Sequence, residues 1–586
     1  MRKTKIICTL GPKTRDVESI RKIMATGIDA IRINFSHDNH EIHGETVKRV
    51  VQVREECNRP IPLILDTKGP EIRTGIMKED KDYRLNIGET FTLTTHEIEG
   101  DNTRVSVTYK NLPFDLQRGS RILIDDGLIE LKVKNLTDTE VECSIENGGL
   151  LGSRKGINIP DVFVNLPPLT EKDTSDIIFG AKVGFDYIAA SFIRCATDVI
   201  KIREILEENG GSDIQIIAKI ENRDGVDNID EILEVADAIM VARGDLGVEI
   251  PAEEVPIVQK MLIKKANSAG KPVITATQML DSMIRNPRPT RAEASDVANA
   301  IFDGTSGIML SGETAKGDYP LEAIQMMDRI AQTAEAEKEK NNQNVMEVTY
   351  GVSMTNAVSH STCDTARELG AACIVTITKS GYTARSVSKF KPNCPIMACT
   401  TNERVQRQLS LVWGCTPILI DYKEKDSTDD VFAKAVQKIE DLGFAKQGDI
   451  IVLSAGIPVG MSGTTNIMKV QYIGNVLAKG TGYGKKCVTG KASVIKVLDE
   501  AHKYFKSGDI LVVNKTTNAY LPYMKKASAI IVEDSSLEEN NHAVIVGRTL
   551  DIPVITGATN IVEILRNCTI ITVDSAKGYV YNGSPQ

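Results

Sequence analysis

The sequence predicts an α/β protein whose centre is a closed (β/α)8 barrel. Short aliphatic runs recur between residues 5 and 314, and a helix-length amphipathic segment follows each of them, as in βα units with a parallel sheet. Eight such runs occur, which is the number that closes a barrel, whereas a doubly wound open sheet more often has about five to seven strands. The predicted strands are 5–11, 30–36, 63–69, 187–193, 216–222, 239–245, 273–279 and 308–314.

An insert separates the third predicted strand from the fourth. Residues 70–167 lack long helical periodicity and alternate short strands with Gly and Asp turns, as in SRILIDDGLIELKVK at 120–134. This pattern predicts a small β-barrel domain at the carboxyl end of the third strand. Barrel enzymes carry their active sites at that end of the strands, so we expect the insert to act as a lid. The barrel itself then comprises 1–69 and 168–335.

Two further domains are predicted after the barrel. An α/β pattern resumes beyond a charged helical stretch and contains strand-to-loop units such as GDIIVLSAGIP at 448–458. We expect it to form an α/β domain at 336–473. A Gly-rich, strand-rich segment then opens with KGTGYGKK at 479–486 and predicts a separate tail domain at 474–586.

Length and composition fit this plan and exclude several functions. A chain of 586 residues is too long for one core, and 41% apolar with 25% charged residues is ordinary for a soluble protein. A formal charge of -9 and 5% aromatics give no reason to expect nucleic-acid binding. No apolar stretch approaches about 18 residues, so no membrane anchor is predicted. The 11 cysteines form no CxxC pair, which favours reduced thiols and a cytoplasmic location.

Polar residues gather at the predicted carboxyl ends of the barrel strands, where barrel enzymes place their catalytic groups. Lys219 and Glu221 lie two residues apart on one strand and therefore on one face, where burial costs several kcal/mol unless the charges are paired or used. One such strand end can be a structural ion pair, but several converging on one mouth need a shared polar ligand. The candidates are Arg32, Asn34, Ser36, His37, Asp66, Thr67, Lys68, Glu71, Arg73, Lys219, Glu221, Arg243, Asp245, Thr277, Gln278, Ser311 and Glu313.

These residue types support metal-assisted chemistry on a phosphoryl group. Glu221 and Asp245 offer carboxylate oxygens without a nearby His or Cys, which favours Mg²⁺ or Mn²⁺. Arg32, Arg73 and Lys219 offer cations for phosphoryl oxygens. There is no Walker A sequence, so a bound nucleotide must be held in some other way.

A second group of oxygen ligands lies on the second and third strands. It has only one formal negative charge, which suits a monovalent cation such as K⁺ better than a second divalent ion. A hydrogen-bonded network at the strand ends is the alternative interpretation. The group consists of Asn34, Ser36, Asp66 and the carbonyl of Thr67.

Several segments resemble the signature segments of the pyruvate kinase family and follow that family's order. The pair NPRPTRAEASDVANA (286–300) and MLSGETAKGDYP (309–320) is not a generic feature of barrels. The resemblance implies a barrel, an inserted lid and a regulatory domain, with phosphoryl transfer from phosphoenolpyruvate to ADP to give pyruvate and ATP. The other segments are TKIICTLGP (4–12), IRINFSH (31–37), LDTKGPEIRTG (65–75), KIEN (219–222), ARGDLGVE (242–249) and TATQMLDSM (275–283).

The resemblance also implies a role for each matching residue. Lys219 would stabilise the transferring phosphoryl group and the enolate, while Thr277 would lie beside the enolate carbon and Ser311 would serve a water relay. Arg32 and Arg73 would contact phosphate. The other implied sites are the amides of Gly244 and Asp245 for the substrate carboxylate, Glu221 and Asp245 for Mg²⁺, Asn34, Ser36, Asp66 and Thr67 for K⁺, and Asn34, His37, Arg73 and Lys155 for the nucleotide. Glu71 is the residue found in K⁺-dependent family members.

An activator site is implied after the barrel. Thr378, Ser380 and Thr383 surround Gly381 after a predicted strand, and hydroxyls and amides in that setting form a phosphate nest. In the family this loop binds a phosphorylated allosteric activator. An ordinary surface turn is the alternative.

The tail resembles the swivelling phosphohistidine domain of phosphoenolpyruvate-utilising enzymes. His542 falls at the phosphorylated position, but Asn541 precedes it where those carriers usually have Ser, and the chain has no ATP-grasp partner domain. We therefore expect a structural or regulatory role for the tail.

Two other functions remain to be weighed at this point. A barrel lyase or mutase acting on phosphoenolpyruvate would share the metal and the arginines, but it would need neither ADP nor the lid. A metabolite-sensing protein that has lost catalysis would keep the activator loop, although the complete set of Lys219, Glu221, Asp245 and Thr277 argues against this. A homotetramer is implied by the resemblance alone.

Overall fold

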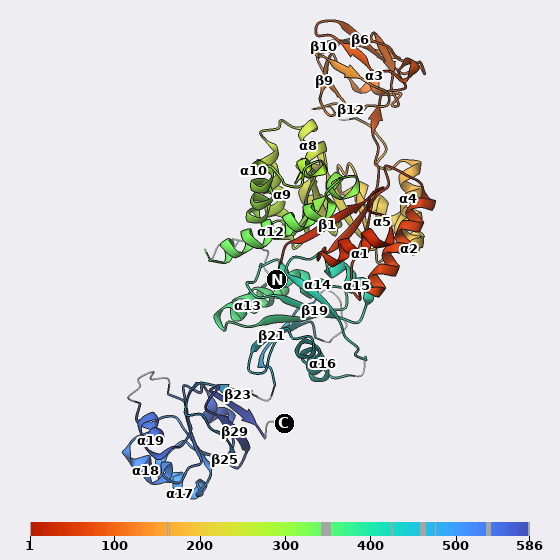
Figure 1. The fold of residues 1–586 in the computed structure, drawn as a ribbon. Helices are drawn as coiled ribbons and strands as arrows, with labels where there is room; N and C mark the ends of the chain where they lie inside the picture. Colours follow the sequence, from red (N-terminus) through yellow and green to blue (C-terminus); the bar gives the residue numbers. More distant parts are fainter. Residues whose placement is uncertain are drawn as a thin grey trace. The chain divides into compact units, whose positions relative to one another are not determined.

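A computed structural model describes most of the chain (Figure 1). The described residues are 2–160, 162, 164–340, 353–423, 426–457, 464–474, 476–534 and 541–583. The chain divides into two compact units, one comprising 1–363, 376–421 and 455–466 and the other comprising 364–375, 422–454 and 467–586.

The first unit contains a closed barrel of eight strands in the order β1-β17-β16-β15-β14-β13-β3-β2. Every neighbouring pair is parallel. Each of the eight predicted runs forms one of these strands, which confirms the barrel and excludes the open sheet. The strands are β1 (Lys5–Leu10), β2 (Ala30–Asn34), β3 (Leu63–Asp66), β13 (Tyr187–Ala190), β14 (Gln215–Ile220), β15 (Ala238–Ala242), β16 (Val273–Ala276) and β17 (Gly307–Leu310).

Side-chain alternation along these strands determines what reaches the barrel interior. On β14, Ile217 belongs to the interior apolar cluster, whereas Ile216 and Ala218 belong to the cluster beneath the helices. Both faces are therefore apolar, which explains the nearly continuous hydrophobic runs. Lys219 follows Ile217 by two residues, so it shares the inward face and lies at the carboxyl end.

Helices surround the barrel (Figure 1). Their ends follow local capping chemistry; for example, Thr290 and Glu293 form a reciprocal capping box at the start of α10, and Gly304 ends it with a φ of 96°. The helices are α1 (Val17–Ala25), α2 (His40–Glu56), α4 (Glu171–Val183), α5 (Ala196–Glu208), α6 (Arg223–Asp227), α7 (Ile229–Val235), α8 (Arg243–Glu249), α9 (Val255–Ala269), α10 (Arg291–Asp303), α11 (Gly312–Ala315) and α12 (Pro320–Lys340).

The insert between β3 and β13 is a β domain with its own apolar core, as predicted. Its main sheet has the order β4-β12-β8-β9-β10-β6-β7, and an isolated bridge joins Thr74 after β4 to Val107 after β7, so the sheet curves back on itself. The elements are β4 (Ile72–Arg73), β5 (Tyr83–Leu85), β6 (Thr90–Thr94), β7 (Arg104–Ser106), α3 (Leu112–Asp115), β8 (Arg121–Ile124), β9 (Ile129–Leu136), β10 (Glu140–Asn147), β11 (Gly149–Leu151) and β12 (Gly156–Asn158).

An α/β region with a five-stranded sheet follows the barrel. Its strand order is β20-β19-β18-β21-β22, and the division between the two units passes through β18. The elements are α13 (Met354–Glu368), β18 (Cys373–Ile377), α14 (Tyr382–Ser388), β19 (Ile396–Thr400), α15 (Glu403–Leu409), β20 (Cys415–Leu419), α16 (Thr428–Asp441), β21 (Ile450–Ala455) and β22 (Ile467–Tyr472).

The tail, in the second unit, is strand-rich as expected. Eight strands are arranged in the order β23-β30-β29-β25-β26-β27-β28-β24, with short helices between them. The elements are β23 (Val476–Lys479), β24 (Thr481–Tyr483), β25 (Cys487–Ile495), α17 (Ala501–Tyr504), β26 (Ile510–Val513), α18 (Leu521–Met524), β27 (Ala529–Val532), α19 (His542–Leu550), β28 (Val554–Thr556), α20 (Ile561–Ile564), β29 (Ile570–Asp574) and β30 (Tyr579–Asn582).

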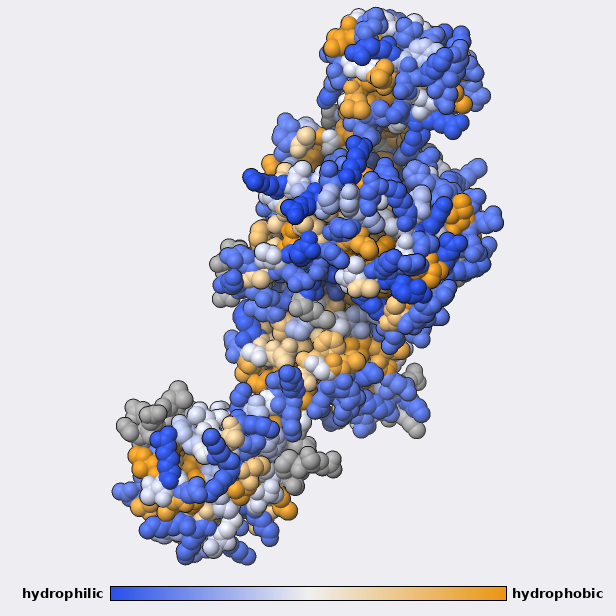
Figure 2. Space-filling model, in the orientation of Figure 1, coloured by the Kyte–Doolittle hydropathy of each residue, from blue (hydrophilic) through white to orange (hydrophobic). Residues whose placement is uncertain are grey.

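The surface drawn in Figure 2 is predominantly hydrophilic, but apolar side chains also gather in a band in the lower middle of the view. Within the described ranges, no helix combines the length and the apolar character needed to cross a bilayer.

Helix α15 and the residues after it close the amino-terminal end of the barrel. Leu411 belongs to the interior apolar cluster, and the Tyr187 hydroxyl donates to the carbonyl of Gln408 at 2.7 Å. Asp186 is fully buried and accepts from Arg407 Nε at 2.9 Å. Burial raises the pKa of Asp186, and the Arg407 charge only partly offsets that effect. The buried carboxylate therefore depends on Arg407.

We expect Arg407→Ala to lower the free energy of unfolding by about 3 to 5 kcal/mol, because it leaves the Asp186 carboxylate buried without its closest cation. The measurement is urea denaturation of the full chain. The matched control is Arg404→Ala on the same helix; Arg404 pairs with Asp213, whose side chain is 62% exposed, so it should cost less than about 1 kcal/mol. Equal losses in the two variants would contradict the interpretation.

Candidate active site

The carboxyl end of the barrel holds a buried network of opposite charges. Asp66 ends β3 and is 1% exposed; it accepts from Arg32 Nε of β2 at 2.5 Å through one oxygen and from Lys219 Nζ of β14 at 3.1 Å through the other. Burial by itself would raise the pKa of Asp66, but the two cations outweigh it and lower the pKa. Asp66 is therefore a fixed anion between two cations.

The Lys219 ammonium has an acceptor for each of its three protons. Besides Asp66, it contacts Glu221 Oε1 at 2.9 Å and donates to Ser191 Oγ at 2.7 Å. Burial by itself would lower the pKa of Lys219, but Asp66 and Glu221 outweigh it and raise the pKa above its ordinary value. Lys219 therefore stays protonated at neutral pH, as an electrostatic group and not as a base.

Glu221 and Asp245 form a pair of buried carboxylates on neighbouring strands. Burial raises the pKa of Glu221 to about 7 against the opposing effect of Lys219, and burial also raises the pKa of Asp245. The amide of Phe192 donates to the second oxygen of Glu221 at 2.6 Å. Both carboxylates have raised pKa values, so a divalent cation bound between them would stabilise their charged forms. No cluster of three or more His, Cys, Asp or Glu ligands occurs in the described part of the chain, so water and substrate oxygens would complete the shell, as Mg²⁺ favours.

The ends of β15 and β16 meet at Thr277. The Thr277 hydroxyl accepts from the amide of Gly244 at 2.7 Å and donates to the carbonyl of Ala276 at 2.6 Å. Arg243 donates to the Thr277 carbonyl at 2.9 Å. Thr277 has a φ of 68°, a left-handed conformation that strains a β-branched residue and that is typical of functional sites. The Gly244 amide, which we expect to meet a substrate carboxylate, thus donates to Thr277 in this structure.

Ser311 lies at the start of α11, directly after β17. Its amide donates to Glu313 Oε2 at 2.8 Å, and the other oxygen of Glu313 accepts from the amide of Leu280 at 3.1 Å. Glu313 is 2% exposed. It therefore ties the end of the eighth strand to the loop that follows Thr277.

The proposed monovalent-cation ligands lie on adjoining ends of β2 and β3. Asn34 pairs in register with Asp66, and its side-chain oxygen accepts from the amide of Ser36 at 3.0 Å. Thr67 is buried, and its carbonyl accepts from Ser191 Oγ at 2.7 Å. These oxygens carry a single formal charge, on Asp66, which fits a monovalent cation better than a second divalent one.

A cleft of about 480 Å³ separates the base of the lid from the barrel mouth, and Arg73, Lys155 and Asp245 are among the residues that line it. Arg73 pairs with Glu71 at 2.6 Å, and Lys155 pairs with Asp125 at 2.9 Å. These residues provide cations on the lid side of the cleft. His37, also predicted for the nucleotide, follows β2 and is not among the lining residues; its carbonyl is 2.9 Å from His43 Nε2.

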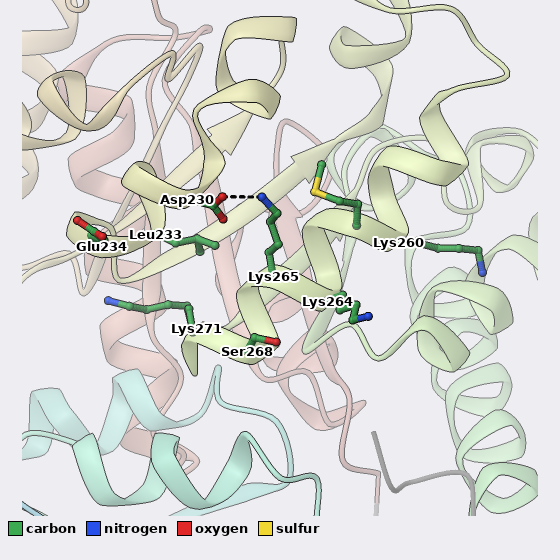
Figure 3. A pocket seen from close by; sticks show the side chains of 10 residues that line it. Asp230, Leu233, Glu234, Lys260, Lys264, Lys265, Ser268 and Lys271 are labelled. Atoms are coloured by element: carbon green, nitrogen blue, oxygen red, sulfur yellow. Dashed lines mark hydrogen bonds and ion pairs between the residues drawn. The ribbon is translucent and has the colours of Figure 1, made fainter. Parts of the chain in front are cut away.

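A larger hollow of about 890 Å³ lies on the outside of the barrel between α7 and α9 (Figure 3). Four lysines line it, and three of them have local partners. Lys265 pairs with Asp230 at 2.7 Å, Lys271 donates to the Ala236 carbonyl at 2.7 Å, and Lys260 pairs with Asp303. Size alone would favour this groove, whereas the buried and perturbed charges favour the barrel mouth as the active site.

The predicted activator residues lie elsewhere, where β18 ends and α14 begins. Gly381 has a φ of 81°, and Arg385 of α14 donates to the Ser380 carbonyl at 3.1 Å. Thr383 accepts from Thr465 at 3.1 Å. Thr378 is buried and its amide donates to the Cys399 carbonyl at 3.0 Å.

His542 begins α19 in the tail. One ring nitrogen lies 3.1 Å from Thr516 Oγ1 and the other lies 3.0 Å from Asn518 Oδ1. Both nitrogens are thus engaged, which agrees with the structural role that we expect.

Sequence reasoning missed Ser191 and Phe192, which follow the fourth barrel strand. The run 187–193 was identified as a strand, but no candidate was taken from its end. The other candidates are polar residues at the carboxyl ends of the barrel strands. Ser191 meets the same criterion, because it is the first polar residue after β13. The role of Phe192 resides in its amide, which no side-chain pattern reveals.

A closed barrel with buried charges at its mouth and an inserted lid defines a barrel enzyme. Family models agree and extend this conclusion. The model described as "Pyruvate kinase, barrel domain" matches residues 1–324. The model described as "Pyruvate kinase, alpha/beta domain" matches residues 356–471. A third model, described as "PEP-utilising enzyme, mobile domain", matches residues 505–578.

Curated relatives match over the full length. A pyruvate kinase of Bacillus licheniformis is 50% identical over 586 residues, which covers 100% of this chain and 99% of the relative. Those of Geobacillus stearothermophilus and Sporosarcina psychrophila are 49% and 48% identical, covering 99% and 100% of this chain and 99% of each relative. The chain belongs to the pyruvate kinase family, as the sequence motifs indicated. It is therefore an enzyme, a glycolytic transferase.

We expect the affinity for divalent cations to fall as the pH drops below about 7, because a proton on Glu221 then competes with the metal. Titration of the substrate-free protein with Mn²⁺ should show a loss approaching tenfold per pH unit below that point and a plateau about one unit above it. Glu221→Gln should bind weakly, with a flatter pH profile. Equal Mn²⁺ affinities at about pH 5.5 and about pH 8 in the unmodified protein would refute the assignment.

Proposed function

We propose that this enzyme transfers the phosphoryl group of phosphoenolpyruvate to ADP and releases pyruvate and ATP, the final step of glycolysis. The observation that supports this most directly is the buried, protonated Lys219 between Asp66 and Glu221, with Arg32 on the other side of Asp66. Phosphoryl transfer needs fixed positive charge where oxygens gain negative charge, and it needs little covalent chemistry from the protein.

The residues at the barrel mouth would have different roles in phosphoryl transfer and in protonation of the enolate. Arg32 and Lys219 would contact the phosphoryl oxygens, and Lys219 would remain near the enolate oxygen after transfer. Glu221 and Asp245 would hold Mg²⁺ (or Mn²⁺), which supplies neutralisation of phosphoryl charge when bound. Since Lys219 keeps its proton, the enolate must be protonated from elsewhere, and Thr277 with a water relay at Ser311 is the proposed route.

The substrate carboxylate would lie at the start of α8. The amides of Gly244 and Asp245 are the proposed donors, at a helix end that favours anions. The Gly244 amide donates to Thr277 Oγ1, so substrate would share or replace that contact and thereby lie against the Thr277 hydroxyl.

K⁺ would be held by Asn34, Ser36, Asp66 and Thr67. It would add positive charge beside Arg32 without a second divalent ion. Glu71 supports K⁺ dependence by resemblance; in the structure it pairs with Arg73 at the base of the lid.

ADP would enter the cleft under the lid. Asn34, His37, Arg73 and Lys155 are the proposed contacts of its phosphates, and Arg73 and Lys155 line the cleft. Lid closure would exclude water that could otherwise intercept the phosphoryl group.

Regulation would act through a phosphorylated activator bound by Thr378, Ser380, Gly381 and Thr383. We further propose a homotetramer in the cytoplasm. On the edge strand β22, Met468 and Val470 are 37% and 41% exposed, which provides an apolar surface for a subunit contact.

The experiment that tests this function measures pyruvate and ATP formed from phosphoenolpyruvate and ADP with Mg²⁺, in the presence and absence of K⁺. We expect both products in equal amounts and a strong loss of rate without K⁺. Lys219→Met is the background control, expected to remain folded without transferring phosphate.

Each of the other outcomes favours one alternative function or overturns one assignment. Consumption of phosphoenolpyruvate without ATP formation would favour the lyase or mutase, and no turnover at all would favour the sensing protein. Full activity without K⁺ would overturn only the monovalent-cation assignment.

We expect His542 to carry no lasting phosphate after incubation with phosphoenolpyruvate, because both of its ring nitrogens have partners. Phosphopeptide mapping under conditions that preserve phosphohistidine tests this. His542→Ala should not change the transfer rate by more than about twofold, as is usual for a group outside the chemistry. An acid-labile phosphate on His542 would instead make the tail a phosphoryl carrier.

A further inference from the structure

Ser191 lies where the barrel strands converge on Lys219, and it is 3% exposed. It follows β13, the fourth strand, between β3 and β14 in the barrel order. Its neighbours on the two sides are therefore the ligands proposed for K⁺ on β3 and the catalytic lysine on β14. No other described hydroxyl donates to the Thr67 carbonyl or accepts from Lys219 Nζ.

The hydrogen bonds of Ser191 have a direction. Its hydroxyl carries one proton, and the contact of 2.7 Å with the Thr67 carbonyl takes that proton, since the next acceptor, Asp66 Oδ1, is 3.5 Å away. The lone pairs of Oγ are then free to accept from Lys219 Nζ, which is also 2.7 Å away. The result is a chain of hydrogen bonds from the ammonium through Ser191 to the Thr67 carbonyl.

The backbone reinforces this arrangement. The amide of Ser191 donates to Thr67 Oγ1 at 3.1 Å, so two contacts join the residues that follow β13 and β3. The φ of Gly69 is 75°, and a Cβ atom placed there would lie 2.8 Å from the Ser191 Cβ. The Ser191 Cβ is therefore packed against the backbone of Gly69, where a residue with a side chain would clash with it.

We propose that Ser191 is a positioning residue that couples the monovalent-cation site to Lys219. The inference rests on the proposed phosphoryl transfer and adds a specific path for its K⁺ dependence. The Thr67 carbonyl has two lone pairs, of which Ser191 engages one and the other can face K⁺. Ser191 holds this carbonyl in place for the cation and, through the same hydroxyl, holds the ammonium where it meets the phosphoryl group.

Asp66 alone does not account for the position of Lys219. Asp66 contacts both Lys219 and Arg32, so it fixes their separation and charge. Ser191 adds the shorter contact and the only neutral one of the three acceptors of Lys219. Loss of the Ser191 hydroxyl leaves the charges of Asp66 and Glu221 in place but removes one acceptor of the Lys219 ammonium. The orientation of the ammonium should therefore change more than the affinity for the substrate.

The test compares Ser191→Ala with the unmodified enzyme. The substitution removes a single oxygen and adds no atom next to Gly69. We expect kcat to fall about 10-fold to 100-fold, as for other outer partners of catalytic groups, with the KM for phosphoenolpyruvate changing less than about twofold. We also expect the K⁺ concentration for half-maximal activity to rise.

A second readout needs no substrate. K⁺ should raise the melting temperature of the unmodified protein relative to Na⁺, because it binds the folded state, and this rise should shrink in Ser191→Ala. The proposed activity is tested separately by the unmodified enzyme, so its failure would not be confused with failure at Ser191.

Ser410→Ala is the matched control. Its hydroxyl is also buried and donates to a backbone carbonyl, that of Pro60, at 2.6 Å, but it lies at the opposite end of the barrel. It should leave kcat and the K⁺ response unchanged. Ser191→Cys, which replaces the hydroxyl by a somewhat larger thiol that hydrogen-bonds weakly, should fall between Ala and Ser, and it takes the place of Ser191→Ala if that variant does not fold.

The proposal is overturned if Ser191→Ala keeps its kcat and its K⁺ response. It is also overturned if only the KM rises, since Ser191 would then be a substrate contact. A loss of kcat that is accompanied by an unchanged K⁺ effect on melting would restrict the residue to Lys219 and refute the coupling.

Discussion

The arrangement at the barrel mouth depends on keeping one ammonium charge buried. Moving a lysine charge out of water costs several kcal/mol, and Lys219 is 8% exposed. Asp66, Glu221 and Ser191 offset this cost by giving each N–H an acceptor. The same arrangement prevents Asp66 from taking up a proton, because Arg32 engages its other oxygen. Charge and geometry are therefore fixed before any substrate arrives, which is what transition-state stabilisation by electrostatics requires.

The barrel explains why these charges can meet without disturbing the core. Strand alternation sends Ile217 into the interior and places Lys219 two residues further along on the same face. Parallel register then places Asp66, Ser191 and Lys219 at one end on three successive strands. At the other end, Leu411 fills the interior, and the Arg407–Asp186 pair joins helix α15 to the barrel. The polar mouth thus comes from the alternation of side chains along the barrel strands, whereas the other end is filled by a residue that follows helix α15.

The sequence was sufficient for the barrel, because eight separate apolar runs each had to form a buried parallel strand. Strand ends also identified Lys219, Glu221 and Asp66, whose side chains meet. Ser191 could have been predicted in the same way as Ser311, another uncharged serine directly after a strand, but no candidate was taken from the end of the fourth strand. The left-handed φ of Thr277 and the amide of Phe192 could not be foreseen, since backbone conformation at a strand end depends on neighbouring strands. The curvature of the lid sheet depends similarly on a long-range bridge between Thr74 and Val107.

Helix α8 links the barrel mouth to the lid. It begins with Arg243, Gly244 and Asp245, and it ends with Glu249. Glu249 accepts from Asn158 of lid strand β12 at 2.8 Å, across the cleft that Arg73 and Lys155 line. The helix that makes this lid contact also carries, in its first turn, the Gly244 amide that donates to Thr277 Oγ1. The strained Thr277 and the lid contact of Glu249 are thus joined through one helix of seven residues, 243–249.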